Sequence, residues 1–83
     1  MFCVYILKSL SNFSYYVGSC SNITERVNLH NKGLVASTKR YIPWELKYKE
    51  EYKTLSEARK REMQIKSWKK RSMIEKIFKD FEI

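Results

Sequence analysis

The chain has 83 residues, and its 17 Lys and Arg residues against 9 Asp and Glu residues give a formal net charge of +8. A chain of this length supports one small domain, so we expect residues 1–83 to form a single folded unit. Because folding of such a domain hides only about 60% of the unfolded surface, we expect a shallow surface site and no deep substrate cavity.

Membrane, zinc and nucleotide-cofactor functions find no support in the sequence. The longest apolar run, from Cys3 to Leu7, is far shorter than the roughly 20 residues of a membrane span, and no basic segment precedes it. Two cysteines and one histidine cannot form a four-ligand zinc site. The short apolar run and the missing basic segment predict a cytoplasmic protein with no membrane partner. Since neither glycine lies in a phosphate-cradling loop, we also expect no small-molecule cofactor.

The positive charge is concentrated in the second part of the chain. Residues 1–38 contain three Lys or Arg residues, and residues 39–83 contain the other fourteen. Such a surface suits a polyanion, of which the phosphate backbone is the commonest, although it could also be a solvated helix surface. The side chains that we expect to contact nucleic acid are Lys8, Lys39, Arg40, Lys66, Lys69, Lys70 and Arg71.

The N-terminal residues predict a β-hairpin. Phe2–Leu7 is β-branched and aromatic and has apolar residues at both parities, which is typical of a strand buried on both faces and central in its sheet. A polar connector over residues 9–14 leads to a second predicted strand, Tyr15–Cys20.

Three helices and one further strand are predicted after the hairpin. Asn22 and Glu25 have N-cap spacing and Gly33 suits a helix end, so we expect a helix between them and a loop over residues 34–43. Alternation indicates a half-exposed edge strand over Trp44–Tyr52. The capping box of Thr54 and Glu57 predicts a helix through about Lys69, and Ser72 caps a last helix.

Several polar residues fall where a plain core would be apolar. Glu62 lies on an apolar helical stripe, where a carboxylate needs a cation. Helical geometry allows an ion pair with Arg59, Lys66 or Arg26, and a carboxylate can equally hold a divalent ion such as Mg²⁺. Arg26 and His30 share one side of the preceding helix, and the hairpin could bring the phenols of Tyr5, Tyr15 and Tyr16 together.

These residues stand in an order that resembles the GIY-YIG endonuclease superfamily, in its small stand-alone bacterial type. The first matching segments are Val4-Tyr5-Ile6-Leu7, Tyr15-Tyr16-Val17-Gly18-Ser19, Glu25-Arg26-Val27 and His30-Asn31-Lys32-Gly33. They continue with Thr38-Lys39, Pro43-Trp44, Tyr48, Glu57-Ala58-Arg59-Lys60-Arg61-Glu62 and Ile65-Lys66-Ser67-Trp68-Lys69. The family's first tripeptide, Gly-Ile-Tyr, is Cys3-Val4-Tyr5 in this sequence, and Val17 replaces the isoleucine of the second tripeptide. A late asparagine of some larger members has no counterpart. The resemblance covers nearly the whole chain.

The resemblance implies a fold, an activity and a set of roles. The fold is α+β, a small, largely antiparallel three-stranded sheet flanked by helices in the order β-β-α-β-α-α. The activity is metal-dependent hydrolysis of DNA phosphodiester bonds, selective for structure more than for sequence in repair or processing, with Mg²⁺ or Mn²⁺ as cofactor. The implied catalytic residues are Tyr5, Tyr16, Arg26, His30 and Glu62, with Glu62 as the metal ligand and Gly18 in a structural role.

The resemblance also sets a problem in acid–base chemistry. Water would be activated by Tyr5 or by a group that Tyr5 orients, but a phenol with a pKa near 10 is only about 0.1% ionised at neutral pH. As a base, Tyr5 would therefore need help from Lys8, Arg26 or His30.

Other functions remain compatible with the sequence. The chain could be a nucleic-acid-binding module without catalysis, or a nuclease subunit whose protein partner supplies target specificity. A basic RNA-associated or ribosome-associated protein also fits the composition, but it leaves the carboxylate of Glu62 unexplained.

Overall fold

The computed structural model describes residues 1–81, with side chains described through Phe78. Three strands and three α-helices follow one another in the predicted order, with a short 3-10 helix in the segment that we expected to be a loop. The elements are β1 (Phe2–Ser9), β2 (Tyr15–Cys20), α1 (Ile23–Asn31), η1 (Lys39–Tyr41), β3 (Trp44–Tyr52), α2 (Leu55–Lys66) and α3 (Arg71–Phe81). No helix within residues 1–81 has the length and apolar character that crossing a membrane requires.

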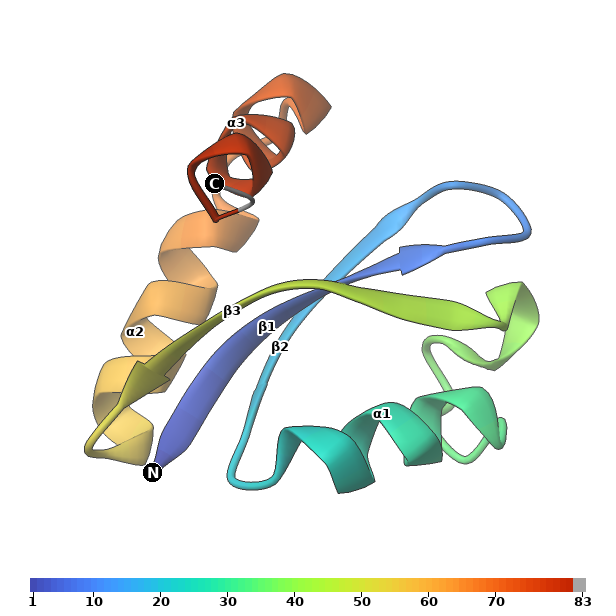
Figure 1. Cartoon of the computed structure of the whole chain (residues 1–83), viewed down its shortest axis with the longest axis horizontal. Coiled ribbons are helices and arrows are strands. Elements are labelled where there is room, and N and C mark those ends of the chain that lie inside the picture. The colour runs from blue at the N-terminus through green and yellow to red at the C-terminus, as the bar shows by residue number, and fades with distance from the viewer. Residues whose placement is uncertain (82–83) are drawn as a thin grey trace.

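β1 is the central strand of a sheet with the order β2-β1-β3, as predicted (Figure 1). It runs antiparallel to both neighbours, so that Ile6 lies between Val17 of β2 and Tyr48 of β3. A register shift between Ile6 and Leu7 pairs Leu7 with Leu46. The antiparallel three-stranded sheet of the α+β fold is therefore confirmed.

The two faces of the sheet carry separate cores. Because successive side chains of a strand point to opposite faces, β1 contributes to both. The buried residues on the face covered by α2 and α3 are Val4, Ile6, Val17, Ala58, Ile65 and Phe78. Those on the face covered by α1 are Cys3, Tyr5, Leu7 and Trp44. The free thiols of Cys3 and Cys20, opposed across β1 and β2 with 3.5 Å between the sulfur atoms, lie on the α1 face.

Capping explains where the helices begin and end. The Asn22 side chain accepts a hydrogen bond from the backbone N–H of Glu25 at 3.1 Å, which starts α1 as predicted. The predicted end of the second long helix at Lys69 is wrong, since α2 ends at Lys66. There the Ser67 hydroxyl donates to a carbonyl oxygen of the last turn, that of Gln64, at 2.6 Å. The last helix begins at Arg71, one residue before the predicted Ser72 cap.

The outer edge of the sheet at β3 carries charges of both signs. Lys47 lies 3.7 Å from Glu45, and Lys49 lies 3.5 Å from Glu51. These side chains are partly exposed, so the ion pairs add little to the stability of the fold. They make the exposed edge of the sheet strongly polar.

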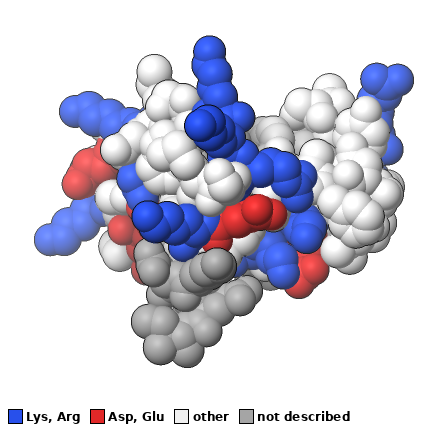
Figure 2. All heavy atoms as spheres, turned by 90° about the horizontal axis from the view of Figure 1, so that it is seen from above, with Lys and Arg blue, Asp and Glu red and all other residues white. Residues whose placement is uncertain are grey.

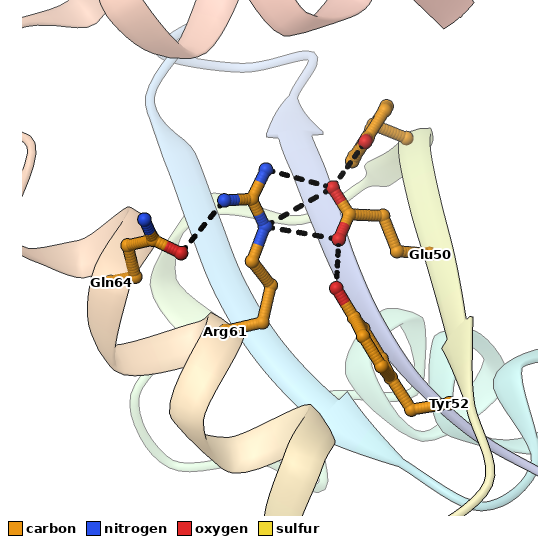
Figure 3. A network of polar contacts seen from close by, with 5 residues as sticks. Glu50, Tyr52, Arg61 and Gln64 are labelled. Atoms are coloured by element: carbon orange, nitrogen blue, oxygen red, sulfur yellow. Dashed lines mark hydrogen bonds and ion pairs between the residues drawn. The ribbon is translucent and has the colours of Figure 1, made fainter.

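A polar network joins β3 to α2 on the opposite face from α1 (Figure 3). The carboxylate of Glu50 accepts hydrogen bonds from the hydroxyls of Tyr48 and Tyr52. It is also held by Arg61, whose Nε lies 3.0 Å from Oε1 and whose Nη2 lies 3.0 Å from Oε2. The Arg61 guanidinium lies 5.4 Å from the ring centre of Trp68, which places it between strand and helix.

The network keeps Glu50 ionised. Burial raises the pKa of Glu50, but the hydrogen bonds from Arg61, Tyr48 and Tyr52 outweigh it, and the pKa lies below its usual value. A carboxyl group whose pKa is depressed in the folded state stabilises the fold above its unfolded pKa. That stabilisation is lost as the pH falls through the folded pKa.

Replacing Arg61 by Met should destabilise the protein more than the same change at Arg59, which is an exposed cation on the same helix. The loss of Arg61 leaves the half-buried Glu50 carboxylate without its cation, so we expect about 2 kcal/mol of lost unfolding free energy at pH 7. Urea denaturation measures both variants, and the difference should shrink at acidic pH. Equal effects of R61M and R59M would show that the network is not stabilising.

Candidate active site

A buried chain of hydrogen bonds connects β1, α1 and the residue before η1. The Tyr5 hydroxyl lies 2.9 Å from Nε2 of His30, and Nδ1 of His30 lies 2.8 Å from the Thr38 hydroxyl. All three side chains are at most 1% exposed. The Thr38 hydroxyl in turn donates to the carbonyl oxygen of Val35 at 3.3 Å.

This row of hydrogen bonds has a direction, because its last acceptor is a carbonyl oxygen. Since Val35 can only accept, the Thr38 proton goes to it, and Thr38 accepts from Nδ1–H of His30. Nε2 of His30 is then an acceptor, and Tyr5 donates to it. This arrangement gives every buried proton in the chain an acceptor.

Burial sets the charge states of Tyr5 and His30. Burial and the nearby charge of Arg26 lower the pKa of His30 to about 4, so the imidazole is neutral at pH 7. Burial raises the pKa of Tyr5 to about 12, although the hydrogen bond from Arg26 acts in the opposite direction. Tyr5 is therefore a neutral phenol at pH 7: of the three residues expected to help it ionise, Arg26 does act in that direction, but burial outweighs it.

Arg26 links the buried chain to the surface. Its Nε donates to the Tyr5 hydroxyl at 3.5 Å, and its side chain lines an open pocket of about 300 Å³ at the start of α1. Tyr5 does not line this pocket, so Arg26 separates the buried phenol from the solvent. The residues lining the pocket are Ser19, Cys20, Ser21, Asn22, Glu25, Arg26 and Leu29.

Tyr16 and Gly18 shape the space around Tyr5 from β2. The half-exposed Tyr16 ring has its centre 5.0 Å from that of His30 and 6.3 Å from that of Tyr5. A Cβ atom on Gly18 would lie 2.6 Å from the Tyr5 hydroxyl oxygen, so only glycine leaves room for the phenol. Tyr15, which we expected near the other phenols, points to the opposite face and donates to Glu75 at 2.8 Å.

Glu62 approaches the pocket through Ser19. The Ser19 hydroxyl, which lines the pocket, donates to Oε1 of Glu62 at 2.6 Å, and Lys66 donates to Oε2 at 2.6 Å. Of the cations allowed by helical geometry, Lys66 is thus the one that pairs. Burial raises the pKa of Glu62, but the hydrogen bonds from Lys66 and Ser19 outweigh it and keep the group ionised.

The cations predicted to contact nucleic acid fall into two sets. Lys39 and Arg40 on η1, with Lys69 and Lys70 between α2 and α3, are exposed. The other three are engaged: Lys66 with Glu62, Lys8 near the ring centres of Phe13 and Tyr15 at 5.6 and 6.0 Å, and Arg71 with the Phe13 carbonyl at 2.6 Å. Figure 2, which looks at the molecule from above relative to Figure 1, shows Lys and Arg side chains spread over that face. The first set offers free charge.

Sequence reasoning gave no role to two polar residues of this site. Thr38 appeared only in the matching pair Thr38-Lys39, within a stretch without periodicity, and its hydrogen bond to His30 shows its place. Ser19 appeared only within a matching segment, although its position on β2 next to Cys20 brings it to both Glu62 and the pocket. Neither residue carries a charge pattern that would have singled it out.

Comparison with known proteins identifies the family. A model of the GIY-YIG catalytic domain matches residues 1–76. The chain belongs to the GIY-YIG family. It is 46% identical over 66 residues to UPF0213 proteins of Staphylococcus aureus strains Mu50, N315 and MW2, across 78% of this chain and 79% of each relative. No solved structure matches it.

Membership confirms the resemblance drawn from the motifs. GIY-YIG is a nuclease family whose members act on DNA and typically use divalent metal ions. Among the residues with described side chains, no three His, Cys, Asp or Glu residues cluster as a metal site. A metal ion at Glu62 would therefore depend on ligands beyond those of the protein, such as water and phosphate oxygens.

The stability of this GIY-YIG protein should fall as the pH drops from about 6.5 to 4, because the only histidine is His30 and its pKa is depressed in the fold. A group with a lowered folded pKa stabilises the fold above its unfolded pKa and loses that effect as the pH falls. We expect about 2 kcal/mol to be lost by pH 5. Denaturant titrations of wild type and His30→Gln measure this, and the variant should show a much flatter profile; equal profiles would contradict the assignment.

Replacing Thr38 by Val should disturb the tautomer of His30 with little change of side-chain volume. Valine cannot accept the Nδ1 proton, so the Nδ1–H form would bury an unpaired donor at a cost of about 1–3 kcal/mol. Nitrogen-15 NMR of the histidine ring should show the Nδ1–H form in the wild type and a shift toward Nε2–H, or lower stability, in T38V. Thr38→Ser keeps the hydroxyl and is the control, so a T38S spectrum like that of T38V would refute the role of the hydroxyl.

Proposed function

We propose that this protein is a metal-dependent endonuclease that hydrolyses DNA phosphodiester bonds and selects its target by DNA structure. The observation that carries the proposal is the placement of Arg26 in an open pocket, backed by the buried chain of Tyr5, His30 and Thr38. Membership of a nuclease family supports the same reaction. Small shallow sites of this kind suit a phosphate group better than a large substrate.

Arg26 is the residue that we assign to the charge of the reacting phosphate. Its Nε is turned toward Tyr5, and among the described residues its Nη atoms have no hydrogen bond or ion pair. These atoms are available to hold two phosphate oxygens, as the planar guanidinium fork does well. Charge that grows on the phosphorus centre would be stabilised most in this half-buried setting.

Tyr5 and Tyr16 receive different roles. Tyr5 is 1% exposed, so we assign it to orienting Arg26 instead of contacting the attacking water. His30 fixes Tyr5 by accepting a hydrogen bond from its hydroxyl, and the lone pairs of the phenol oxygen are then directed toward Arg26. Tyr16, which is half-exposed and packs against His30, is the phenol that a substrate and its water could reach.

Glu62 is the residue that would hold Mg²⁺ or Mn²⁺. The fit is supported by an ionised carboxylate with one oxygen fixed by Ser19 and the other already beside a cation, the ammonium of Lys66. Magnesium is often bound by one or two carboxylates together with water and substrate phosphates. When bound, the ion would polarise a phosphate oxygen and stabilise the leaving oxygen. Lys66 would have to move from Glu62.

The exposed cations are the parts that we assign to DNA backbone binding. Lys39, Arg40, Lys69 and Lys70 are unpaired among the described contacts, so each can release counterions from DNA. They read no sequence, because phosphate contacts position a protein without specifying bases. Target choice would then come from DNA shape or from a protein partner.

Glu62→Gln and Arg26→Lys should each lower the rate of DNA cleavage about a hundredfold or more in the presence of Mg²⁺ or Mn²⁺. The first change removes the charge but keeps an oxygen for Ser19, and the second keeps the charge but removes the fork. Cleavage of labelled duplex, nicked, flap and junction DNA measures the loss. Glu57→Gln, an exposed residue on the same helix, should cleave like the wild type.

The same experiment separates the alternatives. DNA bound but cut by no protein, with every metal, would favour a binding module or a subunit that needs a partner, and copurification would identify that partner. Equal cleavage by wild type, E62Q and R26K would reject both residue assignments. Loss of cleavage in E62Q alone would leave Glu62 in place and remove Arg26 from the mechanism.

A further inference from the structure

The connector between β1 and β2 holds an aromatic ring out in solvent. Phe13 is 57% exposed, and its backbone has a φ of +63°. Aromatic residues rarely adopt this left-handed conformation, which is usual for glycine and tolerated by asparagine. A residue kept in a disfavoured backbone region with an exposed apolar side chain indicates a use for that side chain.

Local hydrogen bonds impose this conformation. The Ser9 hydroxyl oxygen accepts from the backbone N–H groups of Ser11 and Asn12, both at 3.1 Å, and the Ser9 carbonyl accepts from the N–H of Phe13 at 3.0 Å. The Asn12 side chain accepts from the backbone and the hydroxyl of Ser14. These hydrogen bonds fix the backbone of the connector, so the Phe13 ring is held in solvent without a partner.

Two cations contact Phe13, one at its ring and one at its carbonyl. The Lys8 ammonium lies 5.6 Å from the Phe13 ring centre, and Arg71 donates to the Phe13 carbonyl at 2.6 Å. Lys69 and Lys70 directly precede Arg71 in the chain. Among the side chains described through Phe78, Arg71 pairs with one carboxylate, that of Glu75 at 3.6 Å. The ring is thus set in a surface with an excess of positive charge.

The segment with Lys39 and Arg40 also contacts the connector. The Ser9 hydroxyl donates to the carbonyl of Tyr41 at 2.6 Å, and the N–H of Leu10 donates to the carbonyl of Pro43 at 2.9 Å. Six of the seven cations predicted to contact nucleic acid therefore lie on segments that touch the connector or form its base. They are Lys8, Lys39, Arg40, Lys69, Lys70 and Arg71.

We propose that Phe13 stacks on a DNA base exposed at an unpaired position or break, while the surrounding cations hold the adjacent phosphates. The inference rests on the proposed function and adds how the protein would select its DNA. An aromatic face with cations beside it matches the base and phosphate of an unstacked nucleotide, whereas a continuous duplex offers no free base face. A protein partner fits less well, because lysine is depleted at protein–protein interfaces.

Binding assays in EDTA, which prevents metal-dependent cleavage, test this inference. The probes are a duplex with one unpaired 2-aminopurine and a fully paired duplex of the same length. Wild-type protein should bind the duplex with the unpaired base more tightly and change the fluorescence of its 2-aminopurine. Phe13→Ala and Phe13→Gly should lose about tenfold in affinity for the unpaired-base probe and little for the paired duplex. Phe13→Tyr, which keeps a stacking face, should retain both affinities.

Phe13→Gly separates stacking from folding. Glycine adopts a φ of +63° without strain, so F13G should unfold at a temperature equal to or above that of F13A while losing the same DNA preference. The matched control is Leu10→Ala, which removes another exposed apolar side chain, 49% exposed, from the same connector. L10A should bind both probes like the wild type.

The outcomes are distinct. If F13A and F13G bind both probes like the wild type, the stacking role is overturned and the nuclease proposal stands. Equal loss of affinity for both probes, or the same loss in L10A, also overturns stacking in favour of a general surface effect. If wild-type protein binds neither probe, the proposed function itself fails. Only a Phe13-dependent preference for the unpaired base supports the inference.

Discussion

The enclosed phenol of Tyr5 is the constraint on which the arrangement of the α1 face depends. A buried hydroxyl must be paired, and this one is paired with an imidazole that also requires a partner for its other nitrogen. Each requirement recruits another element: α1 supplies His30 and the segment after it supplies Thr38. The Trp44 indole then donates to the Thr38 carbonyl at 2.9 Å, which attaches β3 to the same chain.

The same constraint explains why the chemistry and the apolar core occupy different faces of one thin sheet. Alternate residues of β1 serve the two faces, so Val4 and Ile6 pack under α2 and α3 while Tyr5 takes part in the polar chain under α1. Glu62 and Ser19 lie on the first face, because Ser19 pairs with Val4 and alternates with Val17 along β2. Ser19 also lines the pocket that Arg26 of α1 lines, so the contact between the two faces runs around the edge strand β2.

Local patterns were enough to predict most of the fold. The β-branched and aromatic run Phe2–Leu7, the alternation over Trp44–Tyr52, the capping residues and Gly33 placed these strands and α1, because each of these signals acts over a few residues. The end of α2 was misjudged because the helical pattern continues to Trp68, and only the Ser67 bond to the last turn and the packing of Trp68 near Arg61 stop it. Such contacts are formed by the tertiary structure and leave little trace in periodicity.

In the candidate site, too, local patterns predict some features and tertiary contacts determine the others. Glu62 and Arg26 were visible because a charge on an inward stripe is anomalous, and Glu50 gives a comparable signal between Tyr48 and Tyr52 that was not used. The face on which Tyr15 lies and the direction of the His30 hydrogen bonds follow from register and from Val35, which sequence alone does not supply.

The charged side chains along β3 have a consequence for how copies of this protein meet. An open edge strand offers unpaired N–H and C=O groups on which another strand can grow, and the nine residues of β3 form a long template of this kind. A second strand laid against it would have to desolvate Glu45, Lys47, Lys49 and Glu51 at close spacing. The ion pairs that add little to the fold thus act between molecules, by making sheet extension unfavourable at high protein concentration.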